Sequence, residues 1–167
     1  MFSKEQLLAR LAEGHAARIT VVTPNARLSR ALVADFDSCQ HPEAAWEAAD
    51  ILPFGAFVER LYEDALYSDI AGGLPTLLTA AQEQALWQEA VANSNLLATA
   101  EAADECRKAW SLVHQWRIGK GQGNEDAQAF SAWSLKYREA TRDHIDAARL
   151  PDLVSSLLGE ESLRKPK

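Results

Sequence analysis

Hydrophobic positions in the first part of the chain predict a strand followed by a helix. Residues 19–23 form a β-branched, apolar run without polar alternation, which is typical of a short strand buried on both faces. Beyond this run, apolar residues recur every four positions from Leu28 to Phe36 and predict a helix. Asn25 precedes that helix and is placed to cap its N-terminus. The pattern therefore indicates a strand–turn–helix unit.

A second strand–helix pair and a leading helix complete the N-terminal region. Residues 49–52 predict another short strand, and a helix follows from about Gly55. Ahead of the first strand, Ser3 and Gln6 form a capping-box pattern that opens a helix ending at Gly14. Two strand–helix units in succession favour a small layer with parallel strands.

The chain changes character at residues 70–75, where Gly and Pro interrupt the pattern. No strand is predicted beyond this break. Helices are expected there over residues 79–91, 99–118, 126–145 and 153–158. The predicted fold class is α/β and predominantly helical, with a small parallel-strand α/β lobe over residues 1–70 and an all-helical lobe over residues 71–167. Two parallel strands alone make a poor sheet, so we expect the chain to be a piece of a larger protein.

The composition is that of a globular protein. Of the 167 residues, 47% are hydrophobic and 25% are charged, which excludes a disordered chain. The two cysteines, Cys39 and Cys106, provide neither a disulfide framework nor a four-ligand metal site, and they favour a reduced, cytoplasmic setting. No apolar run approaches the roughly 20 residues that a membrane helix needs. No signal peptide is recognised. We therefore expect a soluble, cytoplasmic protein without a membrane partner.

The distribution of charge is more informative than its total. Seventeen Lys and Arg against 24 Asp and Glu give a net charge of −7, which by itself argues against a nucleic-acid-binding protein. Residues 14–34 and 106–124 nevertheless contain no acidic residue. The bases in the first stretch are Arg18, Arg27 and Arg30, and those in the second are Arg107, Lys108, Arg117 and Lys120. The rest of the chain holds 17 − 7 = 10 bases against 24 acids, a balance of −14.

Basic side chains at the start of a helix suit contact with phosphate, because the free N–H groups of the first turn add to the attraction. Arg27 and Arg30 occupy such a position, so the first stretch is a candidate nucleic-acid site. The second stretch is another candidate basic patch, in which Trp116 offers a face for stacking on a single-stranded base. Trp110 shares an apolar helix face and is expected in the core.

No catalytic constellation is visible. The chain lacks the P-loop pattern, and the glycines within residues 119–123 follow no strand, so they predict a turn between helices. The nucleophile-elbow, zinc-protease and paired-cysteine patterns are absent, and the four histidines are scattered singly. We therefore predict no catalytic residue, no metal ligand and no cofactor. An enzyme with an unrecognised site is the least supported interpretation.

Residues 20–32, TVVTPNARLSRAL, resemble a segment near the start of AddB-like and RecB-like DNA repair proteins. Those proteins have the superfamily 1, UvrD-type helicase fold and often carry a C-terminal PD-(D/E)XK nuclease domain. The segment looks like their motif Ia, which touches the backbone of single-stranded DNA. Residues 51–61, ILPFGAFVERL, are similar to motif Ib, although only the strand–helix pattern and Phe57 agree. Residues 77–83 are similar to the helical 1B insertion, and residues 150–153 also look like a segment of this group.

The resemblance implies part of a helicase 1A domain over residues 1–70 and a 1B insertion over residues 71–167. The resemblance also implies that four residues hold the phosphates of single-stranded DNA: Thr23, Asn25, Arg27 and Arg30. The Walker A loop, the acidic Walker B segment and the nuclease residues are missing, so neither ATP hydrolysis nor cleavage is assigned to this chain. The resemblance thus implies a non-catalytic, degenerate N-terminal module of a DNA repair helicase or exonuclease, whose further domains are its partners.

Two alternatives remain open. Arg27 and Arg30 form an ordinary solvated helix face if they pair with Asp35 or Asp37. Separately, the helical block between Leu61 and Cys106 contains no Lys or Arg. This acidic block predicts a protein-interaction scaffold that docks a basic partner or other lobes of a parent protein.

Overall fold

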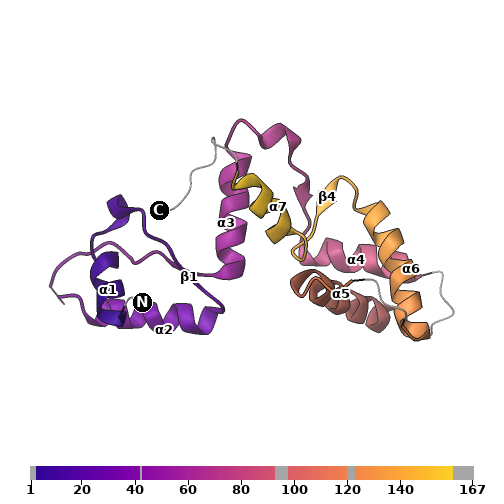
Figure 1. Ribbon diagram of the computed structural model, residues 1–167, viewed down its shortest axis with the longest axis horizontal. Coiled ribbons are helices and arrows are strands. Elements are labelled where there is room, and N and C mark those ends of the chain that lie inside the picture. The colour runs from indigo at the N-terminus through magenta and orange to yellow at the C-terminus, as the bar shows by residue number, and fades with distance from the viewer. Residues whose placement is uncertain (1–2, 42, 93–97, 120–122, 160–167) are drawn as a thin grey trace. The chain divides into compact units, whose positions relative to one another are not determined.

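The computed structural model describes residues 3–41, 43–92, 98–119 and 123–159 (Figure 1). Its helices and strands in chain order are α1 Lys4–Leu11, β1 Val21–Thr23, α2 Ala26–Ser38, β2 Ile51–Pro53, α3 Phe54–Leu66, β3 Thr76–Leu77, α4 Ala80–Val91, α5 Thr99–Gln115, α6 Glu125–Ala140, β4 His144–Ile145 and α7 Leu150–Leu157. The predicted fold class, a predominantly helical α/β protein with a small parallel sheet, is confirmed.

The chain forms two compact units. Residues up to Gly72 belong to the first unit together with those from Ser156 onward, and Gly73–Ser155 makes the second. Each unit contains a hydrophobic core of its own. The division at Gly72 and Gly73 lies within the Gly- and Pro-containing break of the sequence. The predicted assignment of these lobes to helicase domains stays a prediction.

Side-chain caps begin the three helices for which the sequence predicts them. Asn25 accepts a hydrogen bond from the backbone N–H of Leu28 and so starts α2. Capping boxes start α1 at Ser3 and α4 at Thr79. Each cap satisfies an N–H group of the first turn that the helix itself leaves without a partner. The N-terminal boundaries of these helices were therefore predictable.

The sheet of the first unit consists of β1 and β2, which pair in parallel with Val21 opposite Ile51. Helices α1 and α2 cover one face of this sheet, where Leu11, Phe36 and Ile51 are buried. The prediction that the first strand is buried on both faces is wrong, because Val22 is 40% exposed. Val21 packs against this core, and Val22, the next residue along the strand, points to the opposite face of the sheet.

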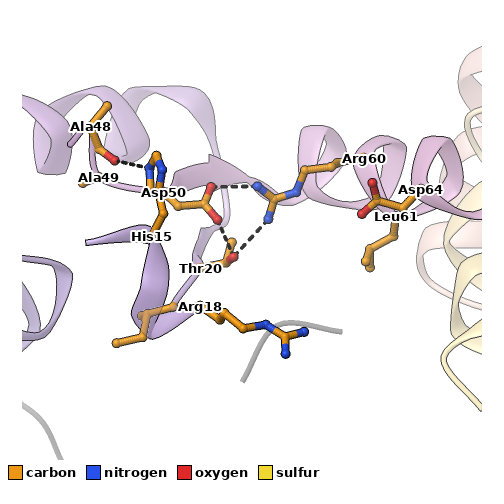
Figure 2. Close-up of a pocket in the computed structure, with 10 residues that line it drawn as sticks. His15, Arg18, Thr20, Ala48, Ala49, Asp50, Arg60, Leu61 and Asp64 are labelled. Carbon is orange, nitrogen blue, oxygen red and sulfur yellow. Dashed lines mark hydrogen bonds and ion pairs between the residues drawn. The ribbon is translucent and has the colours of Figure 1, made fainter. Parts of the chain in front are cut away.

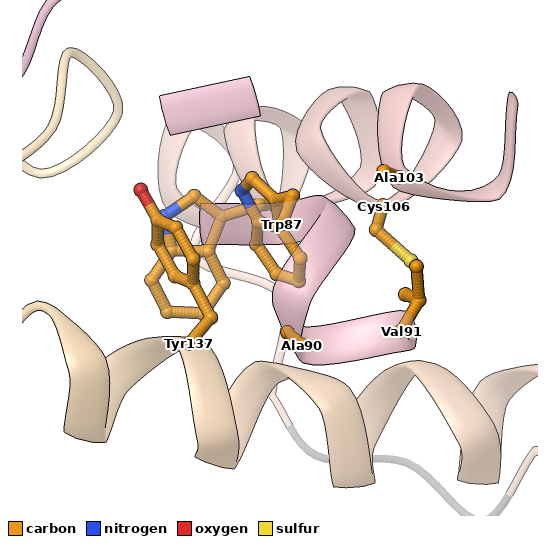
Figure 3. Close-up of a cluster of buried hydrophobic side chains, with 7 residues drawn as sticks. Trp87, Ala90, Val91, Ala103, Cys106 and Tyr137 are labelled. Atoms are coloured by element: carbon orange, nitrogen blue, oxygen red, sulfur yellow. The ribbon is translucent and has the colours of Figure 1, made fainter. Parts of the chain in front are cut away.

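The second unit is built around a cluster of aromatic and small side chains from α4, α5 and α6 (Figure 3). The rings of Trp87 and Tyr137 are stacked, with centroids 4.1 Å apart and an interplanar angle of 8°. Trp110 packs edge-on against both rings and is 5% exposed, which confirms its predicted place in the core. Cys106 is buried beside Ala103, and burial raises the pKa of its thiol to about 11.

Three predictions for the second unit are wrong at the level of its elements. The lobe is not all-helical, because β3 and β4 pair in parallel, with Thr76 opposite His144. The helix expected over residues 126–145 ends at Ala140, where the chain turns into β4. The last helix begins at Leu150 and contains Pro151 in its first turn, where the missing N–H of proline is tolerated. Strands of two residues are too short to leave a recognisable periodicity.

Candidate functional site

The turn from β1 into α2 contains the four residues that the sequence predicts as DNA contacts. Thr23 ends β1 and is only 3% exposed. Its hydroxyl donates to the carbonyl oxygen of Asn25 at 3.0 Å. The side chain of Thr23 thus lies inside the turn and shapes it, and its predicted contact with phosphate stays a prediction. Asn25 is exposed; its carboxamide oxygen caps α2, which leaves the NH₂ group of the side chain facing outward.

Arg27 and Arg30 are both exposed on the first two turns of α2. Within the described ranges Arg27 has neither an ion pair nor a hydrogen-bonded partner. Arg30 donates from Nε to the carbonyl oxygen of Ala26 at 3.2 Å and makes no ion pair with another described residue. The alternative pairing with nearby carboxylates does not occur. Asp35 binds Lys4 at 2.6 Å instead, and Asp37 accepts a hydrogen bond from the indole of Trp46.

Helix α3 begins at the same end of the sheet as α2. Because β1 and β2 are parallel and each leads into its helix, both helix N-termini lie at the carboxyl edge of the strands. Pro53 precedes α3 and makes no side-chain cap. Phe54 in the first turn is 49% exposed. The edge thus combines two helix N-termini, which favour anions, with two exposed arginines and an exposed aromatic ring. We call these residues, Asn25, Arg27, Arg30 and Phe54, the carboxyl-edge surface.

The second predicted basic patch carries internal ion pairs. Lys108 lies 2.7 Å from Asp104 and 2.9 Å from Glu105, and Arg107 also binds Asp104. Arg117 approaches Asp152 at 3.4 Å. Asp104 and Glu105 immediately precede the acid-free stretch in α5, and Asp152 lies in α7. Lys120 falls outside the described residues, and Trp116 is 70% exposed. The basic side chains at the start of α2 are therefore freer to bind an anion than those of the second patch, whose described members form ion pairs.

A cleft of about 440 Å³ lies at the opposite, amino end of the β1–β2 strands (Figure 2). Three polar side chains meet there. Arg60 of α3 donates to Asp50 at 2.8 Å and to the hydroxyl of Thr20 at 3.0 Å, and this hydroxyl donates to Asp50 in turn. The positive charge of Arg60 neutralises the negative charge of Asp50. The hydrogen bonds among the three side chains join α3 to the starts of both strands.

Sequence reasoning missed this cleft, although one signal for it was present. Thr20 and Asp50 lie within the two predicted strands and immediately before β1 and β2, and parallel pairing in this register brings such positions together. The contribution of Arg60 was not predictable in the same way, because the packing angle of α3 decides whether its side chain reaches the strands.

A second group of polar side chains is buried in the core of the second unit. Asp146 is 0% exposed and accepts hydrogen bonds from Trp110, Tyr137 and Arg149. Burial raises the pKa of the Tyr137 hydroxyl, and the neighbouring Asp146 carboxylate adds to this effect. Burial likewise raises the pKa of Glu83, with a smaller contribution from Asp146. The side chains of Trp110, Tyr137 and Arg149 all donate to Asp146, so the group is a structural network within the core.

The described part of the chain shows no group of three His, Cys, Asp or Glu residues that could hold a metal ion. Nor does any helix within it have the length and apolar composition needed to cross a membrane. No family model, curated protein or solved structure matches this chain. The resemblance to AddB-like and RecB-like proteins thus stays a prediction, and functional inference depends on the geometry described above.

Proposed function

We propose that this chain is a non-catalytic, helicase-like module of a DNA repair protein that contacts single-stranded DNA through its carboxyl-edge surface. The observation that carries the proposal is the exposure of Arg27 at the start of α2, with no partner among the described residues. The motif Ia resemblance of residues 20–32 supports the same surface. A cytoplasmic location belongs to this proposal and is supported by the two free cysteines, Cys39 and Cys106.

The chemistry of the surface fits a phosphate backbone better than a base edge. Arg27 and Arg30 supply charge, the side-chain NH₂ of Asn25 supplies a donor, and the first-turn N–H groups of α2 add a partial positive charge. Phe54 offers a face on which an unstacked base can lie. Because the whole chain carries a net charge of −7, contacts are expected to stay local to this surface.

Replacement of both arginines tests the proposal. In the R27A/R30A variant, binding of a labelled oligothymidine should weaken, and the plot of log affinity against log salt should become shallower by about 1.4, since each phosphate contact on a single strand contributes about 0.7 to the slope. Fluorescence anisotropy at low salt measures both quantities.

The matched control is the R10A/R142A variant, which loses the same charge from arginines that pair with Glu13 and Glu139. It should bind DNA like the unmodified chain. Absence of binding by the unmodified chain at low salt, or equal weakening in both double variants, would exclude this surface.

The acidic block between Leu61 and Cys106 favours a second candidate function, that of a scaffold for a basic partner or for other lobes of a parent protein. In the structure α4 carries Glu83 and Glu89 and no base, and Glu89 is exposed. Size-exclusion chromatography with candidate basic partners distinguishes the two functions. Binding of DNA without binding of any such partner counts against the scaffold.

A further inference from the structure

The β1–β2 sheet has one open edge, and it belongs to β1. The N–H of Val21 donates to the carbonyl of Asp50 at 2.8 Å, so the polar backbone groups of Val21 face β2. Backbone groups alternate in direction along a strand, and those of Val22 therefore face away from β2. Val22 is 40% exposed, and no described residue forms a hydrogen bond with its N–H or C=O. An open edge of this kind accepts a further strand.

The corresponding edge of β2 is closed by the fold itself. The N–H of Ile51 donates to the carbonyl of Ala49 at 3.0 Å. The carbonyl of Ile51 accepts a hydrogen bond from the buried hydroxyl of Ser29 in α2, at 2.9 Å. Both outward backbone groups of Ile51, the first residue of β2, are thus satisfied. Among the residues that the structure describes, the β1 side of the sheet is the one that offers an unpaired backbone donor and acceptor.

The charges around β1 indicate which strand fits. Residues 14–34 contain no acid, and arginines flank the strand on both sides, Arg18 before it and Arg27 after it. A second copy of the chain would pair antiparallel across a two-fold axis near Val22. That pairing would bring Arg18 of each copy next to Arg27 of the other, and like charges opposite one another destabilise a sheet. A segment with acidic residues at both ends would instead place opposite charges next to these arginines, and such pairs stabilise a sheet.

We propose that the open edge of β1 binds an extended apolar segment of another polypeptide, with Asp or Glu at both of its ends, as a third strand of the sheet. Main-chain hydrogen bonds to Val22 would supply the contact, and the flanking carboxylates would approach Arg18 and Arg27. This interaction shares Arg27 with the proposed DNA surface, but its main-chain hydrogen bonds to Val22 lie at the side of the sheet and do not depend on DNA binding.

The test uses the full chain and a synthetic peptide that has alternating valines in its centre and two glutamates at each end. Two further peptides carry N-methyl groups on alternate central amides, one on the odd set and one on the even set. Only one set can face β1, so N-methylation should weaken binding about tenfold in one peptide and leave the other nearly unchanged. Fluorescence anisotropy measures all three. A peptide with lysines in place of the glutamates should bind about tenfold more weakly or worse.

A change in the protein provides an independent measurement. The V22P variant loses the N–H that makes no bond within the fold, and it should lose peptide binding while its circular dichroism spectrum stays unchanged. If this variant unfolds, the N-methylated pair alone decides the matter. The proposal is overturned if no peptide binds, if both N-methylated peptides bind equally, or if folded V22P retains binding. Concentration-dependent dimerisation in size-exclusion chromatography that V22P abolishes would show that a second copy occupies the edge instead.

Discussion

Asp146 is a fully buried carboxylate whose oxygens accept hydrogen bonds from neighbouring side chains on several elements. It binds Arg149 through Nε at 2.6 Å, and it also accepts from the indole of Trp110 and the hydroxyl of Tyr137. A buried ion pair of this kind contributes little net stability, because desolvation offsets the attraction. Removing one partner is far more costly, since the other charge then stays buried without compensation.

The D146A variant should therefore lose about 3–5 kcal/mol of its free energy of unfolding. Urea denaturation followed by tryptophan fluorescence measures this loss. D143A, in which an exposed carboxylate three residues earlier is removed, is the matched control and should change little. A loss in D146A no larger than that of the control would mean that the network does not stabilise the fold.

Glu83 makes the stability of the second unit depend on pH. Burial raises the pKa of its carboxyl above the ordinary value of 4.5, and the charge of Asp146 acts in the same direction. The folded chain thus holds this proton more tightly than the unfolded chain does. The free energy of unfolding should fall as the pH rises from the ordinary pKa to the raised one, and it should stay lower above that range.

The E83Q variant removes this titration while it keeps the size and shape of the side chain. At neutral pH its melting temperature should exceed that of the unmodified chain, and the difference should shrink toward zero below pH 4.5, the ordinary pKa of Glu83. Thermal melts across this range measure the effect. E89Q, on the exposed side of the same helix, should show no such dependence; a difference in E83Q that did not vary with pH would contradict the assignment.

At the scale of the element, Asn25 at the start of α2 has both a structural role and a proposed binding role, and two substitutions can distinguish them. The side-chain oxygen of Asn25 caps the helix, and its NH₂ group faces outward. N25A should lose about 1 kcal/mol of stability, whereas N25D keeps a capping oxygen and should lose little. N25D also places a negative charge where phosphate is proposed to bind, so its affinity for oligothymidine should fall below that of N25A. Denaturation and anisotropy on the same two variants separate these effects, and equal affinities would argue against phosphate at this helix start.

The start of α2 also shows what the sequence could and could not predict. The cap at Asn25 and the four-residue spacing from Leu28 to Phe36 are local signals, so the helix was predicted correctly. The burial of Thr23 depends on hydrogen bonds from its hydroxyl to the carbonyls of Asn25 and Leu52, which only the folded turn reveals. The same limit explains why the strands of two residues were missed. The ion pairs of Lys108, in contrast, join residues three and four positions apart in one helix, and this spacing could have predicted them.

At the scale of the whole molecule, two cores imply two unfolding events. Phe36 is 1% exposed in the core of the first unit, and Trp87 is 0% exposed in that of the second. Four of the five tryptophans, all but Trp46, lie within Gly73–Ser155, so tryptophan fluorescence chiefly reports on the second unit.

F36A, which removes about 3–5 kcal/mol from the first core, should shift part of the transition seen by circular dichroism and leave the fluorescence transition near its original midpoint. W87A should shift the fluorescence transition. Coincident transitions in both variants would show that the two units unfold as one.

The two cysteines of the chain differ sharply in accessibility. Cys39 is exposed at the C-terminal cap of α2, whereas Cys106 is buried and its raised pKa, about 11, keeps it in the unreactive thiol form. A maleimide dye should therefore attach to the native chain at a single position, without any cysteine being introduced or removed. That position lies at the far end of α2 from Arg27, about 20 Å away along the helix axis. Energy transfer between this dye and one on an oligonucleotide would then report directly on where the DNA lies.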